Sequence, residues 1–315
     1  MARTIQWISR PEPGTDHRAP TRHVQAGLGL VGIGVAAVLI AAVAGYGGAD
    51  QIAADPAAAG STRAWTFGLT VTGFATIKTA IAIILVGIVL GLWRRVDGVK
   101  HALRVLKPAG RTPTTTGPFE SAFGSGTATA SPPRPLAIHT MAKVLWLPML
   151  VMGGMAVAAG LTAAIVASGA TGDALRQASA WSQGLTFLGE TFLLSGISLL
   201  LGTILAGLRE GGAEVQADVG VTVRTLDMPA SAKAFIALMA VGMMIGIAQF
   251  ALYVNLATNL AADPAAFSAW AAWLGPFREA GLGILLSGIV LALYTISRVL
   301  GFQFSRIRDI VATGA

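Results

Sequence analysis

The 315-residue chain contains no cysteine, and this absence removes several kinds of chemistry. Without thiols there is no disulfide bond, no iron–sulfur cluster and no thiolate nucleophile. The four histidines, His17, His23, His101 and His139, all lie outside the long apolar runs, so a haem held by two histidines within a membrane is not expected. The sequence also lacks a Gly-rich phosphate loop, a metalloprotease motif and a serine-nucleophile motif. We therefore expect no cofactor, no metal site and no catalytic residues.

Charge is also scarce. Charged residues make up 12% of the chain, whereas a soluble domain carries about 25%. Hydrophobic residues make up 54%, and the mean hydropathy is +0.68. A membrane-spanning helix needs about 20 apolar residues, and six runs are long enough: 24–46, 66–93, 144–168, 183–208, 233–257 and 275–300. The sequence predicts an all-α integral membrane protein with six transmembrane helices, in contact with the lipid bilayer.

The basic residues are unevenly distributed between the two sides of these helices. Segments that would share one side, together with the helix ends beside them, hold 18 of the 22 lysines and arginines. The connections on the other side hold only Arg63 and Arg176. Because lysine and arginine favour the cytoplasmic side, we expect a bacterial inner-membrane protein with both termini in the cytoplasm. The net charge of +7 is thus a topology signal, and nucleic-acid binding does not follow from it.

A short motif indicates an internal repeat. AADPAA occurs at residues 53–58 and again at 261–266, and in each copy the aspartate precedes a tryptophan by ten residues, Trp65 or Trp273. Trp181 lies between them, and the segment SGISLLLGTI after it resembles SGIVLALYTI after Trp273. The spacing predicts three tandem helical hairpins related by a pseudo-threefold axis along the membrane normal, although alanine-rich sequences also align by chance.

This repeat divides the chain into five parts. The predicted segments are a cytoplasmic tail, a first hairpin, a linker, a second hairpin, and a third hairpin with the C-terminal tail, over residues 1–23, 24–107, 108–138, 139–227 and 228–315. The linker is rich in Pro, Thr, Ser and Gly, and such a composition predicts disorder. The basic pieces that follow the even helices are expected to meet anionic lipid headgroups, or alternatively to dock a partner protein.

The connections on the outer side carry the Asp-Pro pairs. An aspartate before a proline is typical of a helix start, with the aspartate as N-cap and the proline as first helical residue. Trp65, Trp181 and Trp273 are predicted to be anchors at the outer interface, where the amphipathic indole ring is favoured.

Lys233 and Arg298 lie at the ends of their apolar runs, and four further charged residues lie within the runs: Lys78, Glu190, Arg278 and Glu279. Ionisable residues within a membrane are candidate functional sites by default. Counted from the three aligned tryptophans at 100° per residue, Lys78, Glu190 and Glu279 lie at about 220°, 180° and 240°. They therefore share one helical face, and Lys78 is expected within reach of Glu190, with Arg278 reaching Glu279 or water.

Two functions remain open from the sequence. The first is a small-solute or ion transporter or channel that uses the charged face. The second is a non-catalytic scaffold or accessory subunit of a larger membrane complex, which includes the option of a homo-oligomer. The charged residues have a structural reading as well, since a buried ion pair can simply fix the register between helices.

Overall fold

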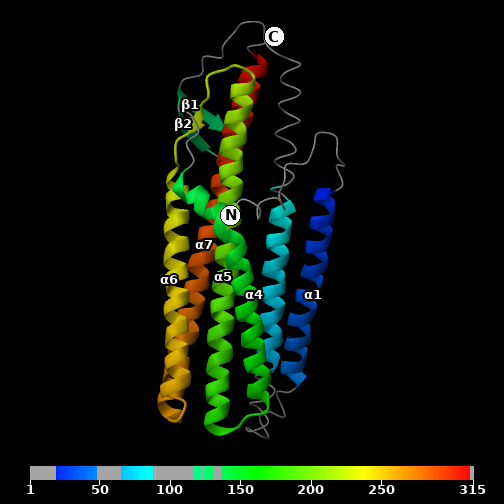
Figure 1. Ribbon diagram of the computed structural model, residues 1–315, viewed down its shortest axis with the longest axis vertical. Coiled ribbons are helices and arrows are strands. Elements are labelled where there is room, and N and C mark those ends of the chain that lie inside the picture. The colour runs from blue at the N-terminus through cyan, green and yellow to red at the C-terminus, as the bar shows by residue number, and fades with distance from the viewer. Residues whose placement is uncertain are drawn as a thin grey trace.

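The computed structural model describes residues 19–47, 65–87, 89, 117–121, 124–130 and 136–312, and long helices dominate it (Figure 1). In chain order the elements are α1 (Ala19–Gly47), a helix over Trp65–Gly87, β1 (Gly117–Ser121), β2 (Gly124–Thr129), α4 (Ala137–Ser168), α5 (Gly172–Asp218), β3 (Thr225–Leu226), α6 (Ala230–Asn259) and α7 (Pro264–Ala312).

Consecutive helices lie side by side (Figure 1). A β-carbon on Gly34 of α1 would lie 2.6 Å from the carbonyl oxygen of Gly73, so α1 and the Trp65–Gly87 helix touch through their backbones. Short turns at residues 169–171 and 260–263 join α4 to α5 and α6 to α7. This pairing does not by itself establish that the three hairpins are repeats of one another.

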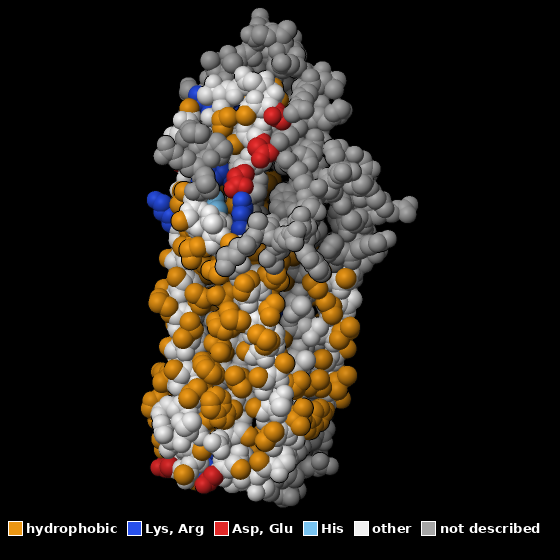
Figure 2. All heavy atoms as spheres, viewed as in Figure 1, with side chains coloured by type: hydrophobic (Ala, Val, Ile, Leu, Met, Phe, Trp, Pro, Cys, Tyr) orange, Lys and Arg blue, Asp and Glu red, His pale blue; other side chains and the backbone are white. Residues whose placement is uncertain are grey.

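Five of the described helices are long and apolar enough to cross a membrane: Trp65–Gly87, α4, α5, α6 and α7. The apolar stretch that the structure describes within α1, Gly29–Ala41, is shorter. Hydrophobic side chains cover most of the lower part of the face in Figure 2, and charged side chains gather above that band and at its lower edge. The multi-pass helical membrane fold that composition predicts is thus supported.

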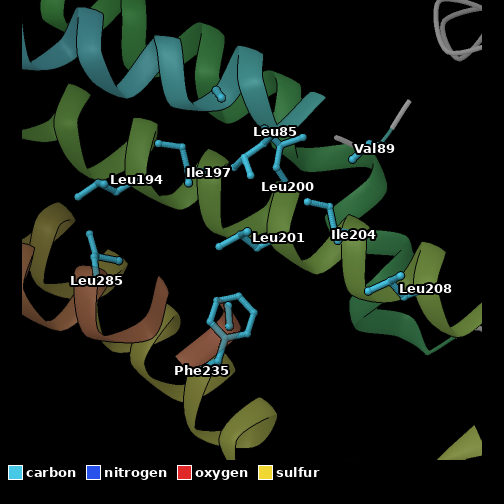
Figure 3. Packing of buried hydrophobic residues seen from close by; sticks show 12 residues of the cluster. Leu85, Val89, Leu194, Ile197, Leu200, Leu201, Ile204, Leu208, Phe235 and Leu285 are labelled. Carbon is cyan, nitrogen blue, oxygen red and sulfur yellow. The ribbon is translucent and has the colours of Figure 1, made fainter. Parts of the chain in front are cut away.

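Helix α5 is the central element. In its most apolar window 67% of the residues are buried, against 33% or less in each of the other four helices. Its side chains form the middle of a large apolar cluster that also takes Leu85 from the Trp65–Gly87 helix, Phe235 from α6 and Leu285 from α7 (Figure 3). A residue on α5 is therefore surrounded by protein, whereas the outer faces of its neighbours remain free to meet lipid.

The two ends of the bundle differ. At the end we call the short-turn end, α4 turns into α5 and α6 into α7 within a few residues. There Asp263 caps α7, because the amides of Ala265 and Ala266 donate to its Oδ1 over 3.0 and 3.1 Å. This confirms the helix start predicted at Asp263 and Pro264; Asp55 lies outside the described residues.

At the opposite end, which we call the extended end, α5 and α7 continue beyond their apolar runs, and a small sheet lies beside them. Strands β1, β2 and β3 pair antiparallel in that order. The hydroxyls of Thr127 and Thr129 donate to the carboxylate of Asp227 over 2.7 and 2.9 Å, and Arg298 of α7 donates to the carbonyl of Ser125.

This sheet corrects one expectation. Residues 108–138 were predicted from composition to be a disordered linker, yet β1 and β2 lie within them. Composition misleads here because the hairpin is stabilised by residues outside the linker. A third strand pairs with it, Asp227 binds its hydroxyls, and Arg298 binds its backbone, so it needs few large apolar residues of its own.

Candidate functional site

Among the described residues, the charged side chain with the smallest exposure is that of Glu190, in the central helix α5. Its side chain is 2% exposed. The residues on either side of it in sequence, Gly189 and Thr191, are buried as well. Since the surrounding helices are apolar, Glu190 is a carboxylate removed from water and dependent on other side chains for its stability.

Lys78 supplies the first partner. Its Nζ lies 3.1 Å from Oε1 of Glu190, and its side chain is 15% exposed. The contact joins the middle of the Trp65–Gly87 helix to α5, across 112 positions of sequence. The pairing of Lys78 with Glu190 that helical spacing predicts is therefore present.

Arg278 of α7 supplies the second partner. Its Nη2 lies 3.6 Å from Oε2 of Glu190, longer than a hydrogen bond but within an ion pair. The guanidinium carbon also lies 5.9 Å from the ring centre of Phe67 and 6.0 Å from that of Phe187. Aromatic faces attract cations at such distances, so the two rings hold Arg278 beside the carboxylate.

The sequence did not anticipate this use of Arg278, which was expected to reach Glu279 or water. The ion pair with Glu190 places Arg278 at the centre of the site. Glu279 follows it in α7, but the side chain of Glu279 lies outside what the structure describes. Three of the four charged residues singled out by the sequence are thus brought together, and they come from three different helices. We call Lys78, Glu190 and Arg278 the ion cluster.

Glycines let α4 and α6 approach α5 closely around the ion cluster. A β-carbon on Gly189 would lie 2.8 Å from the carbonyl oxygen of Gly153 in α4, and one on Gly246 of α6 would lie 2.8 Å from Cβ of Thr191. Neither position accommodates a side chain without a shift of its neighbours. The close approach of α4 and α6 therefore encloses Glu190 and separates it from lipid.

Buried hydroxyls line α5 beyond Glu190, and sequence reasoning missed them. The Oγ atoms of Thr191, Ser195 and Ser198 are buried and make no hydrogen bond to any described residue. In the neighbouring Trp65–Gly87 helix, by contrast, hydroxyls such as that of Thr76 donate to the carbonyl four residues earlier, at 2.8 Å. These three residues are spaced four and then three positions apart, which places them on one helical face, and this spacing is the signal in the sequence that predicts a line of hydroxyls.

The large apolar cluster separates the ion cluster from the extended end. Beyond Glu190, α5 carries Leu194, Ile197 and Leu201, which belong to the same apolar cluster as Leu85 of the Trp65–Gly87 helix (Figure 3). Charged groups within this layer would lose their hydration without gaining partners. In this arrangement the ion cluster is closed toward the extended end by about two helical turns of leucine and isoleucine.

The tryptophans predicted to be interfacial anchors all belong to the short-turn half of their helices. Trp65 and Trp273 are 40% and 51% exposed, and Trp273 stacks on Phe277 with ring centres 5.0 Å apart. Trp181 is half-buried, and its ring centre lies 6.4 Å from that of Phe250. Their role as membrane anchors stays a prediction.

Within the described ranges, no group of three histidine, aspartate or glutamate side chains is placed to hold a metal ion. The chain matches no protein-family model, no curated protein and no solved structure.

Proposed function

We propose that this protein moves an ion or a small charged solute across a membrane, and that the solute or a proton exchanges at Glu190. The observation that supports this most is the position of the Glu190 carboxylate, buried in the central helix between cations from two other helices. Ionisable residues inside membranes are rare, and they concentrate on ion and proton pathways.

The contribution of the ion cluster to stability does not account for its presence. Replacing a buried ion pair with apolar side chains of similar volume is often neutral or stabilising, by about 1–4 kcal/mol. A bundle that needed only packing would therefore do as well with leucine at these positions. The hydroxyls of Thr191, Ser195 and Ser198 add further buried polar groups to α5 that packing alone does not require.

The proposal includes a topology. The bias of lysine and arginine favours the inner membrane of a bacterium, with the extended end in the cytoplasm and the short-turn end outside. We also retain the three tandem hairpins as part of the proposal. Internal repeats surrounding a central site are common in transporters, and the three charged residues of the cluster come from the second helix of each predicted hairpin.

In this topology the ion cluster is closer to the outside, and the apolar cluster closes it toward the cytoplasm. Transport requires a second state, in which Leu194, Ile197 and Leu201 separate from the helices around them. A rearrangement of the ion pairs at Glu190 would trigger this change of state. Removing one partner from a buried carboxylate costs about 3–5 kcal/mol, which is enough to shift the packing of the helices.

The experiment is a flux assay on the purified chain in liposomes. Proton, Na⁺, K⁺ and Cl⁻ gradients are imposed in turn, and movement is followed with ion-sensitive dyes trapped inside. Glu190→Gln is expected to abolish the flux of whichever ion moves, because it removes the charge but keeps the shape. Glu210→Gln is the matched control, since Glu210 also pairs with a lysine, Lys143, but at the exposed extended end.

Absence of every flux from the wild-type protein, or equal flux through wild type and Glu190→Gln, would exclude this function. A loss that also appears in Glu210→Gln would show that any ion pair matters, and the assignment of Glu190 as the site would fail.

A second candidate is a non-catalytic accessory subunit of a membrane complex, and the extended end favours it. There Gln216 of α5, 1% exposed, accepts hydrogen bonds from the amide of Arg224 at 2.8 Å and from Nε of Arg306 in α7 at 3.1 Å. These contacts join α5 to α7 and to the residue before β3, so they order a projection that a partner protein could bind. Native gel electrophoresis of gently solubilised membranes tests this, because an accessory subunit migrates in a complex well above its 32.2 kDa.

A further inference from the structure

A pocket at the extended end has the features of a binding site unrelated to the ion cluster. It has a volume of about 80 Å³ and lies between α4, α5, α7, β3 and the start of α6. Its walls combine apolar side chains, including Leu205, Val299 and Phe302, with the polar groups of His139, Arg209 and Gln303. An apolar wall with a few polar groups on one side is typical of a site for a small amphiphilic molecule.

Arg209 gives the pocket its charge preference. Its Nε is buried and makes no hydrogen bond to any described residue. The adjacent carboxylate, Glu210, is already engaged by Lys143, whose Nζ donates to both of its oxygens at 2.8 and 2.9 Å. A guanidinium placed in this way prefers a carboxylate or a phosphate, because its planar donors match two acceptor oxygens.

The level of the pocket along the bundle narrows the choice of ligand. Arg209 directly follows the apolar run 183–208, and His139 lies five residues before the run 144–168. The pocket therefore lies where the apolar band ends, which in a membrane is the level of the lipid headgroups. Lysine and arginine side chains at the headgroup level attract anionic lipids.

The size of the pocket further limits which ligand it can hold. A water molecule needs roughly 10–15 Å³ by this measure of volume, so about 80 Å³ holds a phosphate group and a few attached atoms but no acyl chain. The chains of a lipid would lie outside, along the apolar surface of the helices. We propose that this pocket binds the headgroup phosphate of an anionic phospholipid, with Arg209 as its main ligand.

The proposal is independent of transport, and lipid-dependent stability tests it. Purified protein in detergent is heated with added phosphatidylglycerol, phosphatidylcholine or inorganic phosphate. A ligand that binds only the folded state raises the midpoint of unfolding, so phosphatidylglycerol is expected to raise it by several degrees, and the other two to leave it nearly unchanged. Native mass spectrometry of the same samples counts the bound lipid.

Two variants and their controls locate the site. Arg209→Gln is expected to weaken phosphatidylglycerol binding about tenfold or more, since a charge-assisted hydrogen bond is lost. Lys143→Gln removes the same charge at the same end of the bundle, from an ammonium that is already paired, and should retain binding. If Arg209→Gln fails to fold, Met228→Glu serves instead. Met228 is 41% exposed at the pocket, and an added carboxylate there repels the phosphate, whereas Met228→Gln does not.

Three results would overturn the proposal. The first is an equal shift with phosphatidylcholine, which means that no charge is recognised. The second is an equal shift with inorganic phosphate, which means that the site takes free phosphate and not lipid. The third is an unchanged phosphatidylglycerol shift in Arg209→Gln or in Met228→Glu, which places the lipid elsewhere on the protein.

Discussion

Two lysine–glutamate pairs in this chain have the same chemistry and nearly the same length. Lys78 and Glu190 are 3.1 Å apart inside the bundle, with side chains 15% and 2% exposed. Lys143 and Glu210 are 2.8 Å apart at the extended end, with side chains 43% and 37% exposed. The buried pair has a second cation, Arg278, beside its carboxylate, and the exposed pair has water.

The comparison shows that surroundings, and not contact distance, decide what an ion pair does. An exposed pair contributes about 0–1 kcal/mol, because water solvates each charge almost as well as its partner does. A buried pair costs several kcal/mol to desolvate, and its partners then become indispensable to one another. Breaking the two pairs in parallel ways therefore measures the effect of the membrane interior directly.

The largest expected effect is that of Glu190→Leu. It removes the carboxylate that both Lys78 and Arg278 contact, while both cations remain in the bundle. We expect a loss of about 3–5 kcal/mol in the free energy of unfolding, the usual effect of leaving a buried charge uncompensated. Unfolding by SDS in mixed micelles measures it, and a loss below about 1 kcal/mol, as for a surface pair, would mean that water reaches the cluster.

Lys78→Met should cost less, about 1–3 kcal/mol, because Arg278 still faces the carboxylate. The double change Lys78→Met with Glu190→Leu should recover much of what Glu190→Leu loses, since one buried charge of each sign is then gone. A double-mutant cycle isolates the coupling between the two residues. Simple additivity of the two single changes would contradict the interaction that the 3.1 Å contact implies.

The double variant also distinguishes a structural role of the ion cluster from a role in transport. If flux returns together with folding, the pair only fixes the register of the helices. If folding returns without flux, the charges are part of the pathway.

Much of this arrangement could be predicted from local sequence patterns. The apolar runs predict the long helices because a bilayer core imposes a minimum length, and Asp263 before Pro264 predicts the start of α7 because both residues act within one turn. The pairing of Lys78 with Glu190 follows from helical periodicity once the tryptophans are aligned.

Other features depend on contacts that no local pattern records. Arg278 pairs with Glu190 because Phe67 of the Trp65–Gly87 helix and Phe187 of α5 hold its guanidinium, whereas the sequence favoured its immediate neighbour Glu279. Strand β2 binds Asp227, about 100 residues away, through two threonine hydroxyls, whereas composition reports only the linker itself. The pocket beside Arg209 is assembled from five elements and has no motif.

Arg278→Met provides an intermediate case. The contact of Arg278 with Glu190 is longer, 3.6 Å, and the arginine side chain is 21% exposed. We therefore expect Arg278→Met to lower the free energy of unfolding by about 1–2 kcal/mol, part of it from the lost cation–π contacts with Phe67 and Phe187. Arg278→Lys is the control: it keeps the charge but loses the planar shape, and it should recover only part of the loss. A loss larger than that of Lys78→Met would reverse the order of the two cations.

The smallest effect is expected at the exposed pair. Lys143→Met and Glu210→Leu should each change the free energy of unfolding by about 0.5 kcal/mol or less, and a cycle of the two should give a coupling below about 1 kcal/mol. Salt provides the control, because screening acts on exposed charges and much less on buried ones. Raising the salt from 0.05 to 0.5 M should remove what coupling there is between Lys143 and Glu210 and leave that between Lys78 and Glu190 nearly unchanged. A salt-dependent coupling between Lys78 and Glu190 would mean that ions and water reach the cluster in the folded protein. The two pairs would then differ because solvent reaches Lys78 and Glu190 only when the helices open, and not because this pair is permanently buried.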